Sequence, residues 1–192
     1  MKTLVLVYGR FQGPHKGHYL MCDTAWDITK SYCTPDDPTK AEMIIVPTKT
    51  YNIHNPIPFQ EKVQVMNIVL EDFAAFIQPD APSSIIDILK GFQDNYQRVV
   101  LVCGADRASS FDRIMQTYNG IQYEYEDIQV VSCGERDGST DVSTASGTKV
   151  RESIAARDYD AFDELMPSNM TEESVRRAYD LLSECISEKE HK

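Results

Sequence analysis

The feature that most constrains this chain is the alternation of short apolar runs with longer stretches of helical periodicity. Runs rich in β-branched residues read as strands, and a continuous apolar run is typical of a strand buried on both faces. Four such runs cover residues 3–8, 43–46, 98–103 and 128–133. Strands that alternate with helices imply a parallel sheet covered on both faces. We therefore expect an α/β fold with a doubly wound parallel sheet.

Helical spacing of apolar residues predicts the remaining elements. The predicted helices cover about 17–30, 59–77, 84–92, 107–118, a segment from 147, 158–165 and 172–188. Residues 134–145 are rich in Gly, Ser, Thr and Asp and read as a loop. A break at Met166-Pro167 predicts a main domain over residues 1–165 and a C-terminal helical extension, 166–192, packed on it.

The formal net charge of −11 limits the partners of the chain. Such a charge disfavours binding to nucleic acid and to anionic membranes. No apolar run is long enough to span a bilayer, and the one after Lys2 is too short for a signal peptide. Five scattered cysteines without a CxxC pair fit reduced thiols. We expect a cytoplasmic protein, in which an anionic substrate needs a local cluster of positive charge and backbone amides.

Two of the four histidines lie in the stretch GRFQGPHKGH, residues 9–18, directly after the first predicted strand. His15 and His18 are three apart at a helix start, so they lie on one face beside unpaired amides and the positive end of the helix dipole. This combination suits a phosphate, to which imidazoles donate hydrogen bonds. The alternative is a helix start with two solvent-facing histidines. Ligands of such sheets bind beyond the carboxyl ends of the strands, which favours the phosphate site.

A second candidate phosphate site is the stretch ASGTKVR, residues 145–151. Ser146 is a natural N-cap, and Thr148 and Arg151 are spaced to face the same anion. The arginine offers a planar fork for phosphate oxygens. The alternative is an ordinary capped helix with a surface arginine.

A third stretch, VCGADRASSF at residues 102–111, follows the third predicted strand. Gly104 permits close approach of a ligand because it has no Cβ. Asp106 either caps the next helix or binds a ribose hydroxyl, and the sequence leaves both open.

The first stretch resembles the first signature of the HxGH nucleotidyltransferase superfamily. It is most similar to the archaeal and phage-type nicotinamide-mononucleotide adenylyltransferases, whose loop typically reads GRFQPxHxGH. The chain departs from that pattern at Gly13-Pro14, while His15, Gly17 and His18 stay in register.

The second stretch resembles the (S/T)xTxxR signature of the same superfamily. There these residues hold the β- and γ-phosphates of the nucleoside triphosphate. The matching positions are Ser146, Thr148 and Arg151, with Lys149 and the amide of Gly147 as helpers.

Two weaker likenesses concern the nucleoside and the acceptor. Residues 104–111 look like the GxDxxxxF element, whose aspartate lies near the nucleotide ribose. NPIPFQEK, residues 55–62, resembles an acceptor-binding loop, in which Asn55 would bond an amide or ribose and Lys62 the acceptor phosphate. The alternative is a loop and a helix cap, with Lys62 in solvent. Relatives stack a tryptophan on the pyridine ring. Here Trp26 falls on the first predicted helix, and Tyr51 or Phe59 is the candidate replacement.

The resemblance implies a Rossmann-like enzyme that transfers AMP from ATP to a phosphorylated acceptor and releases pyrophosphate. Nicotinamide mononucleotide, giving NAD, is the first choice of acceptor. A cytidylyltransferase and a pantetheine-phosphate adenylyltransferase are the nearest alternatives, and a nucleotide-binding scaffold or virion component, in a host cytoplasm, is the alternative of another class. Mg²⁺ would accompany ATP without a dedicated set of protein ligands, and a homo-oligomer is compatible with the sequence.

The residue roles implied by the resemblance fall into three groups. The catalytic residues are His15, His18 and Arg151. The nucleotide- or phosphate-binding residues are Gly9, Arg10, Phe11, Gln12, Lys16, Gly17, Gly104, Asp106, Ser146, Gly147 and Thr148. The acceptor-binding residues are Asn55 and Lys62.

Overall fold

The computed structural model describes residues 1–133 and 145–187. The predicted loop 134–145 therefore lies outside the described residues except for Ala145, and so does residue 188 at the predicted end of the last helix. The strands are β1 Thr3–Gly9, β2 Ala41–Pro47, β3 Arg98–Gly104 and β4 Asp127–Cys133. The helices are α1 Lys16–Tyr32, α2 Phe59–Val69, the 3₁₀ helix η1 Glu71–Phe76, α3 Ile85–Phe92, α4 Ala105–Tyr118, α5 Gly147–Ala155, α6 Tyr159–Asp163 and α7 Glu172–Ser187. None of these described helices is both long enough and apolar enough to cross a membrane.

The four strands form one parallel sheet in the order β2-β1-β3-β4, which confirms the predicted α/β, Rossmann-like class. In register, Leu6 of β1 lies between Ile44 of β2 and Leu101 of β3. The direction of winding changes between β1 and β3, the switch point beyond which ligands of such sheets bind.

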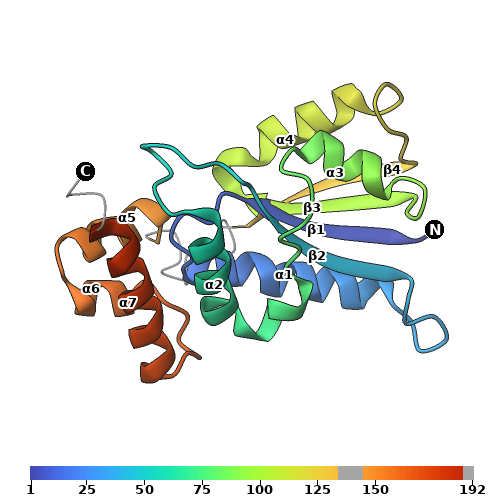
Figure 1. Ribbon diagram of the computed structural model, residues 1–192. Helices are drawn as coiled ribbons and strands as arrows, with labels where there is room; N and C mark the ends of the chain where they lie inside the picture. The colour runs from blue at the N-terminus through green and yellow to red at the C-terminus, as the bar shows by residue number, and fades with distance from the viewer. Residues whose placement is uncertain (134–144, 188–192) are drawn as a thin grey trace. The chain divides into compact units, whose positions relative to one another are not determined.

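Contacts divide the chain into two compact units. The first combines Met1–Gly9, Met21–Thr48 and the described part of Phe76–Asp137, and it contains the whole sheet. Figure 1 shows α3 and α4 on one face of this sheet and residues 21–32 of α1 on the other. Leu4 to Val7 of β1 are fully buried, because both faces are covered, and this explains the continuous apolar run.

The second unit combines Arg10–Leu20, Lys49–Ala75 and the described part of Gly138–Lys192. In it α7 packs against α2 and α5, and α6 packs against α5 and α7; Figure 1 shows α7 beside α2. Val175, Ala178 and Leu182 of α7 are buried in this packing, and Leu181 is half-buried. The predicted boundary at residue 165, between a main domain and a C-terminal extension, is not one of the boundaries between these two units. It stays a prediction.

The single helix predicted over 59–77 is wrong in its second half. The regular helix α2 ends at Val69, and Leu70 donates its N–H to the Met66 carbonyl at 2.8 Å as the helix closes. The 3₁₀ helix that follows starts with Glu71 and Asp72, acidic residues that favour a helix N-terminus. Apolar spacing continues through the break, so periodicity alone could not reveal it.

Candidate active site

Two turns that are far apart in the sequence touch each other in the second unit. The first turn is residues 10–18, and the second turn is residues 145–151. Arg151 Nη1 donates to the Gln12 carbonyl at 2.5 Å, and Nη2 of the same guanidinium donates to Thr148 Oγ1 at 3.3 Å. Thr148 and Arg151 therefore share one face of α5, as their spacing predicts.

Two glycines make this contact sterically feasible. A Cβ on Gly147 would lie 2.5 Å from the Gln12 carbonyl oxygen, closer than real Cβ atoms come to any neighbour. A Cβ on Gly13 would lie 3.0 Å from Cβ of Val150, and Gly13 has φ +102°. Proline, which the resembled family carries at the position of Gly13, cannot adopt that φ.

The rings of the first turn form a stack. The His15 and His18 ring centroids are 4.1 Å apart, and the Phe11 ring lies 4.7 Å from that of His18. Phe11 is 1% exposed and has φ 49°, a conformation that is strained for a bulky side chain. Such strain is concentrated at functional sites, where the surrounding structure holds it in place.

Both histidines are held neutral. Burial, followed by the charge of Lys16, lowers the pKa of His15 to about 4. Burial, followed by the proximity of His15, lowers the pKa of His18 well below its ordinary value. The Gly17 N–H donates to His15 Nδ1 at 3.0 Å, which assigns the His15 proton to Nε2 and leaves that atom as a donor.

His18 has one polar atom without a partner. The residue as a whole is half-buried, but Nδ1 is shielded from solvent and makes no hydrogen bond to the described residues. A buried polar atom in this state costs free energy unless a ligand or water satisfies it. The shielding of Nδ1 argues against the alternative of two solvent-facing histidines.

The second turn carries fixed positive charge. Burial and the charge of Arg10 lower the pKa of Arg151, while Glu152 opposes them. Two arginines are therefore brought near each other, an arrangement that an anion would stabilise. Ser146 is the N-cap of α5, as predicted, and its Oγ accepts from the Lys149 N–H at 3.2 Å.

Lys16 links the start of α1 to the end of α6. Its Nζ donates to the Glu164 carbonyl at 3.0 Å, and its N–H donates to the Leu165 carbonyl at 2.9 Å. These bonds anchor the start of α1, whose first turn holds His18 and which His15 directly precedes.

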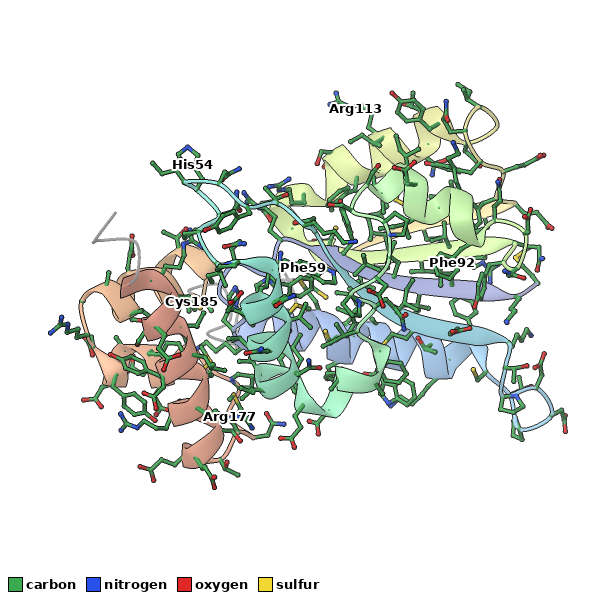
Figure 2. All side chains as sticks on the ribbon, viewed as in Figure 1. His54, Phe59, Phe92, Arg113, Arg177 and Cys185 are labelled. Atoms are coloured by element: carbon green, nitrogen blue, oxygen red, sulfur yellow. The ribbon has the colours of Figure 1, made fainter. Side chains whose placement is uncertain are left out.

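The loop of residues 49–58 leads into α2 and is tied to the first turn through Gln12. Gln12 Nε2 donates to the Ile57 carbonyl at 3.0 Å, and Gln12 Oε1 accepts from the Ile57 N–H at 2.8 Å. Asn55 is buried and donates from Nδ2 to Asn52 Oδ1 at 2.9 Å, which closes a turn inside the loop. Figure 2 shows His54 out on this loop and Phe59 at the start of α2.

Lys62 is fully buried, so the alternative that places it in solvent is wrong. Burial lowers the pKa of Lys62 to about 8. Its Nζ lies 5.3 Å from the Phe59 ring centroid, and the Nζ of Lys49 lies 5.7 Å from the same centroid. Sequence reasoning missed this burial, although Lys62 stands at helical spacing with the buried Val65 and Met66 of α2.

The aromatic candidates for a pyridine ring have different settings. Trp26 packs on Phe76, with ring centroids 5.3 Å apart, inside the first unit. Tyr51 is exposed on the 49–58 loop, and Phe59 is half-buried near the Nζ atoms of two lysines. Of these, Phe59 and Tyr51 belong to the unit that holds both turns.

Three of the predicted site residues belong to the first unit. Gly9 is the last residue of β1, and Gly104 is the last of β3. Gly104 also occupies the N-cap position of α4, so Asp106 is in the first turn and is not the cap. The Asp106 side chain is 82% exposed, with Arg107 Nε 3.9 Å from its Oδ2. The cap alternative for Asp106 is therefore wrong.

No protein cage for a metal is evident in residues 1–133 and 145–187. There, no three side chains of His, Cys, Asp or Glu are grouped so that they could hold an ion.

The chain matches no family model, and no curated protein matches it. Several solved structures share its fold. A protein of Vibrio parahaemolyticus, provisionally assigned as a nicotinate-nucleotide adenylyltransferase, gives a TM-score of 0.57 at 12% identity over 95% of this chain and 99% of that one.

Nicotinic acid mononucleotide adenylyltransferase of Plasmodium falciparum is similar in two complexes. The complex with APC gives a TM-score of 0.52 at 10% identity over 99% of this chain and 96% of that one. The complex with NaAD gives 0.50 at 10% identity over 98% and 96%. At such identities the likeness establishes only the fold, an α/β Rossmann-like sheet. It does not establish the activity, because one fold hosts many activities.

Proposed function

We propose that the chain is an adenylyltransferase that joins AMP from ATP to a pyridine mononucleotide. The observation that carries the proposal is the direct contact between the two turns, Arg151 Nη1 on the Gln12 carbonyl at 2.5 Å. It supports one phosphate cradle with imidazoles from one side and a guanidinium from the other. The fold shared with nicotinate-nucleotide adenylyltransferases agrees with this chemistry.

In the proposed reaction, a phosphate oxygen of the acceptor forms a bond to the α-phosphorus of ATP. The bond from that phosphorus to the bridging oxygen breaks on the opposite side, and pyrophosphate leaves with the electron pair. No covalent enzyme intermediate is required. Catalysis then consists of positioning and stabilisation of charge on the phosphoryl oxygens.

The side chains divide this work. Neutral His15 and His18 donate hydrogen bonds to the reacting phosphates, and the His15 Nε2 proton is available for this. Arg151, Thr148 and the amides at the start of α5 grip the departing pyrophosphate. Arg10 and Lys149 add positive charge to a chain whose net charge is −11.

Mg²⁺ would accompany the triphosphate. Because the described residues offer no carboxylate cage, phosphate oxygens and water would supply most of its ligands. When bound, the ion would neutralise part of the phosphate charge.

On the acceptor side, Lys62 and the 49–58 loop are the proposed contacts, with Asn55 shaping the loop. Phe59 or Tyr51 would stack on the pyridine ring. Likeness of the loop favours nicotinamide mononucleotide, and the names of the structural neighbours favour the nicotinate form.

The test is pyrophosphate release from ATP and, in parallel, from CTP, with a panel of acceptors. The panel contains nicotinamide mononucleotide, nicotinate mononucleotide and phosphopantetheine. Release that requires ATP and either pyridine mononucleotide is the expected result. Release with phosphopantetheine alone, or only from CTP, would assign a different transferase. ATP binding without release for any acceptor would point to a scaffold.

A further inference from the structure

The carboxamide of Gln12 is committed to protein contacts. Gln12 is 5% exposed, and its Oε1 and Nε2 form a reciprocal pair with the N–H and carbonyl of Ile57. Nε2 also lies 3.4 Å from the Thr50 carbonyl. The side chain therefore pairs with the 49–58 loop as a neighbouring backbone strand would.

The sequence around Ile57 explains why this pair matters. Ile57 lies between Pro56 and Pro58, and proline has no N–H, so Ile57 supplies the only backbone donor of this tripeptide. Ile57 is fully buried. A buried backbone N–H without a partner is costly, and Gln12 provides the partner.

The main chain of Gln12 contacts the second turn of the site. The Gln12 carbonyl accepts from Arg151 Nη1, and Gly147 packs directly against it. One residue thus links the loop proposed for the acceptor, through its side chain, with the turn proposed for pyrophosphate, through its main chain. All of these contacts lie within the second unit.

We propose that Gln12 is a positioning residue, which sets the acceptor loop relative to Arg151 without touching the nucleotide. This inference rests on the proposed function for the role of the 49–58 loop in acceptor binding. The hydrogen bonds that join Gln12 to Ile57 and to Arg151, which we call the Gln12 clamp, do not depend on that function. Removing the carboxamide should weaken acceptor binding and leave ATP binding almost unchanged, since every variant keeps the carbonyl that holds Arg151.

The experiment compares Gln12→Ala and Gln12→Glu with a matched control, Gln122→Glu, which adds the same charge at an exposed position of the first unit. Steady-state kinetics give KM for each substrate, and NMR hydrogen exchange follows the Ile57 amide. Gln12→Ala should raise the acceptor KM about tenfold, with the ATP KM within about twofold, and should speed Ile57 exchange by about tenfold or more.

Gln12→Glu keeps an oxygen that can accept the hydrogen bond of the Ile57 N–H. It also places a carboxylate against the carbonyls of Thr50 and Ile57. It should retain slow exchange at Ile57 and still raise the acceptor KM. The control should match the wild type in both measurements. If Gln12→Ala does not fold, as judged by thermal unfolding, Gln12→Glu alone decides the kinetic question.

The outcomes separate the inference from the proposed function. Equal changes in both KM values, or unchanged exchange at Ile57 in Gln12→Ala, would overturn the positioning role. A wild-type chain that releases no pyrophosphate with any acceptor would overturn the proposed function. In that case fast Ile57 exchange in Gln12→Ala would still establish the clamp, and slow exchange would refute it.

Discussion

The two turns of the candidate site have the same local architecture, but the side chains that they bring to the site differ in charge and in burial. Each begins a helix, and each offers backbone amides to an anion. The first turn stacks two neutral imidazoles, those of buried His15 and half-buried His18, with Phe11. The second turn exposes Thr148 and Lys149 and keeps a charged guanidinium half-buried.

The difference shows how a strongly acidic chain can build an anion site. Fixed charge attracts a phosphate over several ångströms, and keeping the charge partly solvated limits the cost of taking it out of water. Neutral donors act only in contact, but they can be buried at little cost and aimed at the place where charge develops. We infer that the second turn captures the triphosphate and the first turn acts on the reacting phosphates.

Loss of the charged side should have the largest effect. Arg151→Ala should lower kcat/KM about 10³-fold, because an arginine at transferring phosphoryl groups is worth at least that much. The control is Arg113→Ala, an exposed arginine of α4 that Figure 2 labels. Steady-state kinetics of pyrophosphate release provide the measurement, and equal rates in the two variants would remove Arg151 from the site.

Loss of a neutral donor should come next. His18→Ala should lower turnover by about 10²- to 10³-fold, roughly 3 to 4 kcal/mol, the scale of one transition-state donor. Folding should change little. Tyr118→Ala, which removes an exposed ring at the end of α4 in the first unit, is the control. A His18→Ala variant with near-normal turnover would mean that the imidazole stack is only structural.

Forcing the two turns apart should cost stability as well as activity. Gly147→Ala places a methyl group against the Gln12 carbonyl and should lower the free energy of unfolding by about 1–3 kcal/mol. Gly91→Ala is the control, because a Cβ there meets nothing within 4 Å. That change lies in α3 and should instead stabilise by about 0.5–1 kcal/mol. Denaturant unfolding measures both, and no loss in Gly147→Ala would contradict the close contact.

Burial of the His15 imidazole should also make the free energy of unfolding depend on pH. The pKa of His15 is about 4 in the folded chain, below the ordinary value of about 6.5 that applies when it unfolds. Between these values only the unfolded state takes up the proton, so stability falls as pH falls from about 6.5 to 4. The slope from one such group approaches 1.4 kcal/mol per pH unit. His15→Gln should show a shallower fall than the wild type, and identical slopes would contradict the burial.

The sheet could be predicted from the sequence because its signals are local. Each strand is a run of apolar residues, and all four appear within two residues of the predicted ends at both sides. The break after Leu70 could not be predicted, because apolar spacing runs straight through it. The class of fold follows from the alternation of strand and helix alone.

The site was predictable only in part. The motifs identify Ser146 as a cap and place Thr148 and Arg151 on one face. The bond from Arg151 to the Gln12 carbonyl joins residues 139 apart, and nothing local signals it. The positive φ of Phe11 is equally hidden, since no glycine marks it.

The central claim is that both turns grip one triphosphate. The most direct measurement is a crystal structure of the chain with a non-hydrolysable ATP analogue. We predict phosphate oxygens at hydrogen-bond distance, about 3 Å, from an imidazole nitrogen of the first turn and from the Arg151 guanidinium in the same complex. A triphosphate that contacts only one turn, or binds elsewhere on the chain, would contradict the account.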